Sequence, residues 1–388
     1  MKALALGAAL WMVAATLPPG DSGLTVHEWG TFTSVAAEDG SAAQWHTLGC
    51  GGDLPEFVNF EQFRGWKVTL GGTVRMETPV MYFYSPREIE ASVRVSFPNG
   101  LMTEWYPGAD NGVFKKNGAS GEMLRLPPNL NGINLSMMNQ SGVLEWKSVK
   151  VQPEGSTEFP VTHTPNRYYA ARATDAAPLA VGNQREKFLF YRGVANIQVP
   201  LAALVMDDGG VTIESERPNQ LGSVFLFENR GGVVGYRKVE ELYSYSTRLD
   251  RPQPGSAIAQ IKADLKSALI AQGLYPKEAA AMIETWRDSW FEEGSRVIYI
   301  LPTSTVDEML PVEVSPRPVK TERVFVGRIE LITPETKRTV QEAIAKNDMR
   351  TLTAYQRFFE PILKSIGMQP WKVADDVRAA VACRSYGN

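Results

Sequence analysis

Residues 91–106, ASVRVSFPNGLMTEWY, indicate most directly that the protein is built on β-structure. Val93, Val95 and Phe97 alternate with polar residues, which is the period of a strand with one buried face. The sequence Pro98-Asn99-Gly100 follows and is typical of a type I turn that closes through a glycine bulge. A second run of β-formers comes next, so we expect the two runs to pair as an antiparallel hairpin.

Similar β signals extend to both sides of this stretch. Residues 74–84, VRMETPVMYFY, are rich in β-formers, and Pro79 among them indicates an edge strand or a bulge. Two further hairpins are expected, over residues 197–215 with the turn DDGG and over residues 223–239 with the turn NRGG. We interpret two stretches of weak periodicity as long loops, residues 115–140 and 152–185.

Beyond Pro252 and Pro254 the apolar period becomes helical. The expected elements are helices at residues 258–272 and 276–293, strands at 296–301 and 322–332, and helices that begin at Thr333 and Asp348.

Together these patterns predict an α+β protein. A β-rich, antiparallel, sandwich-like part would span residues 24–250, and a helix-rich α+β part would span residues 255–388. The late strands leave a second arrangement open, in which they return to the first sheet and make one continuous domain.

The first twenty residues predict a signal peptide. Lys2 precedes an apolar run from Ala3 to Thr16, and Pro18-Pro19-Gly20 ends any helix there. A run this short suits a secretory segment better than a membrane span, which needs about 20 apolar residues. We therefore expect an exported protein, periplasmic or extracellular, with no membrane span after signal removal. The alternative is an ordinary buried N-terminal helix.

The composition excludes several classes of function. The chain has 388 residues, 44% of them hydrophobic, and a net charge of −3, so no global positive field favours nucleic acid. Cys50 and Cys383 lack the spacing of a zinc or redox motif, although one bridge between them is an open alternative. No phosphate-binding or nucleophile motif is present, and we predict no cofactor.

Residues 25–32, TVHEWGTF, read as a strand that carries an ionisable group on each face. His27 and Trp29 share one face, and Glu28 lies on the other. Whichever face is buried must hold a paired, neutral or functional group, because an unpaired buried charge is costly. We therefore take Glu28 as a candidate catalytic residue and Trp29 as a candidate ligand contact, against the alternative of structural residues.

Three histidines offer a second type of site, since His27, His46 and His163 together are enough to hold one transition metal. Nothing in their spacing shows that they converge. We expect no metal, and name these three as its ligands if one binds.

Carboxylates on the predicted strands suggest acid–base chemistry. Glu77 shares a strand face with Arg75, and Glu104 follows the turn at residues 98–100. Two carboxylates on neighbouring strands can act as acid and base in glycoside cleavage. Glu77 is therefore a candidate catalytic residue and Arg75 a candidate ligand-binding residue, against the alternative that the two form a surface pair.

The sequence TWRDSWFEEG at residues 285–294 places Glu292 and Glu293 at a predicted helix C-terminus, where they oppose the helix dipole. Such local conflicts are expected at functional sites, so Glu292 is a catalytic candidate and Glu293 a ligand-binding one. Arg287 is a further ligand-binding candidate, unless it only offsets this charge.

Aromatic residues are the last candidates. Tyr82 and Trp105 offer flat faces to a sugar or another ligand, against the alternative that they fill the core.

Three stretches carry a family resemblance: VHEWGTFTS at residues 26–34, METPVMYFY at 76–84 and TWRDSWFEEG at 285–294. They resemble an uncharacterised family of exported bacterial proteins, over most of the chain. The resemblance implies export and no particular activity.

Three hypotheses of function follow. The first is a binding or interaction protein for a small molecule, such as a sugar or a peptide. The second is an extracytoplasmic hydrolase that uses carboxylates such as Glu28, Glu77 and Glu292. The third is a histidine-based metalloprotein.

Overall fold

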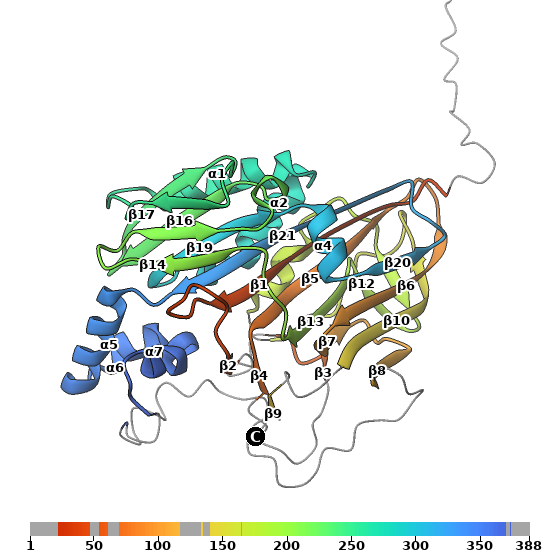
Figure 1. Cartoon of the computed structure of the whole chain (residues 1–388). Coiled ribbons are helices and arrows are strands. Elements are labelled where there is room, and N and C mark those ends of the chain that lie inside the picture. The colour runs from red at the N-terminus through yellow and green to blue at the C-terminus, as the bar shows by residue number, and fades with distance from the viewer. Residues whose placement is uncertain are drawn as a thin grey trace, which may run out of the picture.

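A computed structural model describes residues 22–46, 54–60, 70–116, 133–134, 140–163, 165–369 and 373 (Figure 1). It confirms the predicted α+β class, with large antiparallel sheets and helices mostly in the C-terminal part. The predicted signal peptide at residues 1–20 and both cysteines, Cys50 and Cys383, lie outside the described residues.

A nine-stranded sheet forms the centre of the molecule (Figure 1). Its strands, in spatial order, are β17 (Val233–Val239), β16 (Val224–Arg230), β19 (Gly294–Leu301), β21 (Lys320–Leu331), β1 (Thr25–Val35), β5 (Val74–Tyr84), β13 (Leu189–Ala195), β7 (Gly100–Tyr106) and β3 (Asn59–Phe60). The β1–β21 pair is parallel and the other pairs are antiparallel. Because β19 and β21 lie between β16 and β1, the late strands do return to the first sheet.

A second sheet packs against one face of the first. It contains β12 (Gln184–Glu186), β11 (Leu179–Val181), β10 (Gln140–Val151), β6 (Ile89–Pro98) and β20 (Val312–Ser315), and β8 (Asn111–Lys116) also pairs with β10. Phe32 and Met76 of the large sheet share a core cluster with Val93 and Trp146 of the second. This apolar layer is the inside of the predicted sandwich.

Two three-stranded sheets complete the β-structure of the described residues. One contains β14 (Ala202–Val205), β15 (Val211–Glu214) and β18 (Ser246–Leu249), and the other β2 (Trp45–His46), β4 (Leu70–Gly72) and β9 (Ile133–Asn134).

Helices at residues 258–290 cover the other face of the large sheet, whereas the helix at residues 303–309 packs on the sandwich side (Figure 1). The α-helices are α1 (Ile258–Ala271), α2 (Pro276–Thr285), α3 (Arg287–Trp290), α4 (Thr303–Met309), α5 (Pro334–Lys346), α6 (Met349–Ala354) and α7 (Phe359–Ser365). The 3-10 helices are η2 (Arg167–Arg172), η3 (Pro218–Gln220) and η4 (Gln356–Phe358). Leu265 of α1 and Met282 of α2 share a second core cluster with Phe225, Ile298 and Val324 of the sheet. The sheet is therefore buried on both faces.

The hairpin predicted at residues 91–106 is wrong in its pairing. Both strands form, but β6 pairs with β10 and β20, whereas β7 pairs with β13 and β3. Asn99, at φ 53°, turns the chain from one sheet into the other. Alternation shows which face of a strand is buried and does not identify its partner. The hairpins with the turns DDGG and NRGG are confirmed.

The helix predicted at residues 276–293 is broken at Trp286, which separates α2 from α3. The other helix starts agree with the structure, because the side chains of Thr333 and Asp348 accept hydrogen bonds from backbone N–H groups of α5 and α6. The predicted loop at residues 152–185 contains η2, β11 and part of β12. Within the described ranges, we find no helix with the length and apolarity that crossing a membrane requires.

Candidate functional sites: a buried ionic network and an open cleft

Glu28 lies on the sandwich side of β1, fully buried. Its Oε2 accepts from Nε of Arg323 at 2.6 Å, and Oε1 accepts from the hydroxyl of Tyr191. Asp307 binds the same guanidinium at 2.5 Å. Ion pairing inside the core explains how this carboxylate is accommodated, and it agrees with the structural alternative.

Glu77 lies on the opposite, helix-covered face, so the structure does not bring it together with Glu28. Its Oε1 is 3.3 Å from Nε of Arg75 and also pairs with Arg357 of η4. The side chains of Arg75 and Glu77 are only 6% and 3% exposed. The prediction of a surface pair is wrong, because β5 is a central strand with both faces covered.

Glu292 joins the same face through a chain of arginines. It accepts from Nη2 of Arg328, and Nη1 of Arg328 donates to Ser289 at 2.8 Å. Ser289 also accepts from Arg357, the partner of Glu77, at 2.8 Å. Glu77 and Glu292 therefore belong to one network, connected through two guanidinium groups and a hydroxyl.

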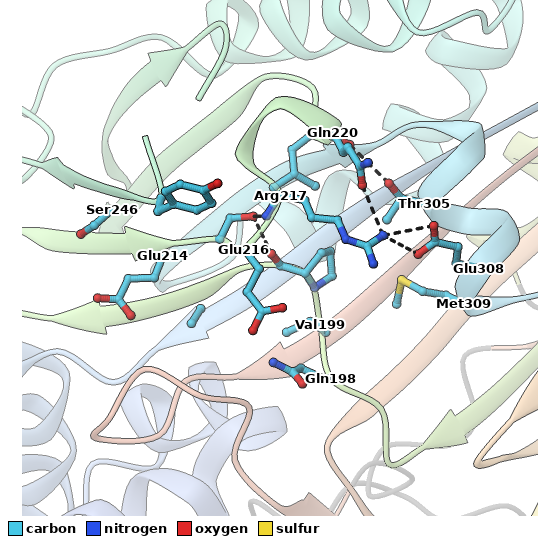
Figure 2. A pocket seen from close by; sticks show the side chains of 15 residues that line it. Gln198, Val199, Glu214, Glu216, Arg217, Gln220, Ser246, Thr305, Glu308 and Met309 are labelled. Atoms are coloured by element: carbon cyan, nitrogen blue, oxygen red, sulfur yellow. Dashed lines mark hydrogen bonds and ion pairs between the residues drawn. The ribbon is translucent and has the colours of Figure 1, made fainter. Parts of the chain in front are cut away.

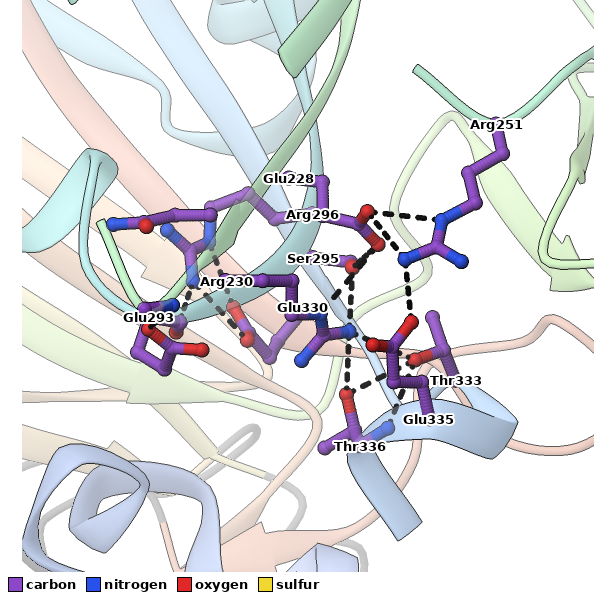
Figure 3. Close-up of polar contacts among 12 residues, drawn as sticks. Glu228, Arg230, Arg251, Glu293, Ser295, Arg296, Glu330, Thr333, Glu335 and Thr336 are labelled. Atoms are coloured by element: carbon purple, nitrogen blue, oxygen red, sulfur yellow. Dashed lines mark hydrogen bonds and ion pairs between the residues drawn. The ribbon is translucent and has the colours of Figure 1, made fainter. Parts of the chain in front are cut away.

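Arg296 extends this network toward the edge of the sheet (Figure 3). Its side chain is fully buried, pairs with Glu330 at 3.0 Å and donates to the backbone oxygens of Glu292 and Glu293 at 2.7 Å. The Glu293 carboxylate accepts from the backbone N–H of Gly231 at 2.9 Å. Glu292 and Glu293 therefore lie beyond the end of α3 and not in its last turn. The Glu292 carboxylate binds Arg328, and the Glu293 carboxylate binds the turn at Gly231.

An outer part of the network reaches solvent (Figure 3). Arg251 pairs with Glu228 and Glu335, and Arg230 donates to Thr333 at 2.9 Å and Thr336 at 3.0 Å. This part connects the C-terminal helices to the sheet.

The aromatic candidates fill the core. Trp29 and Tyr82 are fully buried, and the Tyr82 hydroxyl donates to the backbone oxygen of Ala171 at 2.7 Å. Trp105 is partly buried against the sandwich core. The placements of Trp29 and Tyr82 agree with the core alternative, and Trp105 packs on the core with part of its surface exposed.

Arg287 does not offset the charge of Glu292 and Glu293. It is exposed and pairs with Glu284 and Asp288, which raise the pKa of its guanidinium.

The two histidine side chains that the structure describes, those of His27 and His163, lie in different surroundings. His27 is buried, with Nδ1 2.9 Å from Oε2 of Glu278, and its ring packs on that of Tyr275 with centroids 4.3 Å apart. His163 is exposed, and nothing is described for the side chain of His46. Among the residues that the structure covers, no group of three His, Cys, Asp or Glu side chains is arranged to hold a metal ion.

Sequence reasoning missed an open cleft between the sheet β14–β15–β18, η3 and α4 (Figure 2). Its volume is about 570 Å³, within the usual range for small-molecule sites. Four separate chain segments line it, residues 198–202, 214–221, 245–246 and 305–309. No local sequence pattern predicts such a site, because its lining residues come from segments that are far apart in the chain.

The lining of this cleft is rich in hydrogen-bonding groups. Arg217 pairs with Glu308, and its Nη1 lies 2.9 and 3.1 Å from the two carboxylate oxygens of Glu308. Glu214 and Glu216 are both exposed, and Gln198 also lines the cleft (Figure 2). The lining contains the carboxylates of Glu214, Glu216 and Glu308 and the guanidinium of Arg217, so its net charge is −2.

Tyr245 adds an aromatic face to the cleft. Its side chain is 72% exposed, although its backbone oxygen is fixed by the N–H of Ser215 at 2.9 Å. The exposed ring offers a flat apolar face beside the polar groups of the cleft.

Comparison with protein-family models and with curated proteins found no match to this chain.

Proposed function

We propose that this protein is exported and binds a carbohydrate in the open cleft. The observation that carries the proposal is the exposed ring of Tyr245 beside a cleft of about 570 Å³ lined by carboxylate, amide and hydroxyl groups. A sugar presents an apolar ring face that packs on an aromatic side chain, and hydroxyl groups that donate to carboxylates and amides. Export is supported by the apolar run at residues 3–16.

A basic peptide is the second candidate, and the charge of the cleft favours it. Because Glu308 is occupied by Arg217, the carboxylates of Glu214 and Glu216 remain to attract a cationic group. This binding would weaken with added salt, whereas the binding of a neutral sugar would not.

The test is a thermal-shift and calorimetric screen of the full-length protein with neutral oligosaccharides and with lysine-rich peptides. A ligand at 100 times its Kd raises the stability of the folded state by about 2.7 kcal/mol. We expect an oligosaccharide to produce this shift, and Tyr245→Ala to abolish it.

Tyr243→Ala is the matched control. Tyr243 is two residues away and 86% exposed, but it does not line the cleft. Equal loss of binding in both tyrosine variants, or binding that persists in Tyr245→Ala, would contradict the proposal. Binding of peptides alone would select the second candidate.

A further inference from the structure

Two carboxylates of the open cleft share one face of the chain. Glu214 is the last residue of β15, and Glu216 lies two positions further along. Both side chains line the cleft and are exposed, whereas Ser215 between them is buried. This alternation is that of an extended chain, in which every second side chain points to the same side. The two negative charges therefore face the same space.

The basic residue of the lining does not neutralise these two charges. Arg217 pairs with Glu308, and its Nη1 also lies 3.5 Å from the side-chain oxygen of Gln220. Figure 2 shows the guanidinium turned toward Glu308 and away from Glu214 and Glu216. Within the described ranges, no ion pair or hydrogen bond reaches the carboxylate of Glu214 or Glu216. A cation for them has to come with the ligand.

A ligand that fills the cleft replaces water around Glu214 and Glu216. Removing water from a charged group is costly unless a hydrogen bond and an opposite charge take its place. A sugar hydroxyl supplies the hydrogen bond without the charge, whereas an ammonium group supplies both. The two carboxylates therefore favour a ligand that carries a positive charge.

The rest of the lining favours a sugar ring over a lysine side chain. Tyr245 offers a flat apolar face, on which the apolar side of a sugar ring packs. Gln198 and Ser246 add an amide and a hydroxyl, which bind the hydroxyl groups of a sugar. A lysine side chain has no groups to pair with them beyond its ammonium. One ligand satisfies both parts of the lining if it combines a sugar ring with a cation.

We infer that the open cleft selects an amino sugar with a free ammonium group, and that Glu214 and Glu216 bind this group. The inference rests on the proposed carbohydrate binding and narrows its class of ligand. Acetylation of the amine removes the charge, so an N-acetylated sugar loses this advantage. An acidic sugar is disfavoured, because its carboxylate is repelled by a lining of net charge −2.

The test uses three trisaccharides with the same β-1,4-linked backbone. At carbon 2, cellotriose has a hydroxyl, the glucosamine trimer an ammonium group and the N-acetylglucosamine trimer a neutral acetamide. Calorimetry with the full-length protein at low salt gives each Kd. We expect the glucosamine trimer to bind about 2- to 30-fold more tightly than cellotriose, since each exposed ion pair contributes modestly. Added salt should reduce this difference.

The double variant Glu214→Gln/Glu216→Gln tests the assignment of the two residues. It keeps the shape and the hydrogen-bonding groups of both side chains and removes both charges, so the Kd values of the glucosamine trimer and cellotriose should converge. Glu284→Gln/Glu342→Gln is the matched control. It makes the same change in net charge at two exposed glutamates that do not line the cleft, and it should retain the preference.

Trilysine separates charge from ring. It carries ammonium groups without a sugar, so we expect it to bind more weakly than the glucosamine trimer. Tighter binding of trilysine would contradict the inference and would select the peptide candidate.

The remaining outcomes distinguish this inference from the proposed function. Equal affinity for cellotriose and the glucosamine trimer would overturn the inference and leave carbohydrate binding in place. A preference that persists in Glu214→Gln/Glu216→Gln, or tightest binding of the acetylated trimer, would do the same. If none of the three trisaccharides binds, the proposed function and this inference both fail.

Discussion

Glu28 and Arg323 form a buried ion pair between the first and last strands of the described sheet, with Oε2 and Nε 2.6 Å apart. They are direct neighbours in the parallel β1–β21 register, although 295 residues separate them in the chain. Both side chains are at most 1% exposed. This pair fastens the N-terminal part of the fold to its C-terminal part.

Loss of one partner should be costly. Arg323→Ala leaves the buried carboxyl group of Glu28 without its cation, so we expect the free energy of unfolding to fall by about 3–5 kcal/mol. Urea denaturation measures this. The double variant Glu28→Leu/Arg323→Met should recover most of the loss, because no buried charge is then left unpaired. Equal losses in the single and double variants would show that the loss does not come from an unpaired buried charge.

Alkaline pH should unfold the protein. Burial raises the pKa of Tyr106 and of Tyr355 to about 12, from an ordinary value of 10.0. Between these values the unfolded chain releases protons that the folded protein keeps, so this contribution to stability is complete below pH 10 and declines as pH rises toward 12. Circular dichroism and tyrosinate absorbance, followed together, should change in one transition within this window. Ionisation of all the tyrosines near pH 10 in an intact fold would contradict the prediction.

Substitution of Thr333, at the start of α5, should lower the stability of the protein. Its hydroxyl accepts from the backbone N–H of Thr336 at 3.1 Å and from Arg230 at 2.9 Å. Thr333→Ala removes both bonds, so we expect a loss of at least about 1 kcal/mol in the free energy of unfolding. Thr333→Ser keeps the hydroxyl and should stay close to the parent protein. Thermal unfolding monitored by calorimetry compares the two, and similar losses would exclude the capping role.

Gly327 should not tolerate a methyl group. A Cβ built on it would lie 2.0 Å from Cζ of Tyr299, its cross-strand neighbour on β19. We expect Gly327→Ala to lower the free energy of unfolding by about 1–3 kcal/mol, because the buried ring has to be displaced. Gly108→Ala is the control, since its Cβ would meet the flexible ends of Gln184 at 3.2 Å and of Asn59 at 3.9 Å. Guanidinium chloride denaturation of both variants measures the difference.

The sequence by itself determined the local elements. Alternation predicted the strands, the turns DDGG and NRGG predicted two hairpins, and Thr333 and Asp348 predicted where helices begin. These features depend on residues a few positions apart, which a linear pattern contains. The same reasoning placed Glu28 and His27 on opposite faces of β1, as the structure does.

Only the tertiary structure decided which elements meet. The run at residues 91–106 divides between two sheets. Glu28 pairs with Arg323 and does not lie with the other candidate acids, Glu77 and Glu292. The open cleft takes its lining from four segments, and Thr78 is strained because neighbouring strands enforce its conformation. The physical reason is the same in each case. The propensity to form a strand or a helix is set by near neighbours, whereas strand pairing, charge compensation and strain depend on groups that only the folded chain brings into contact.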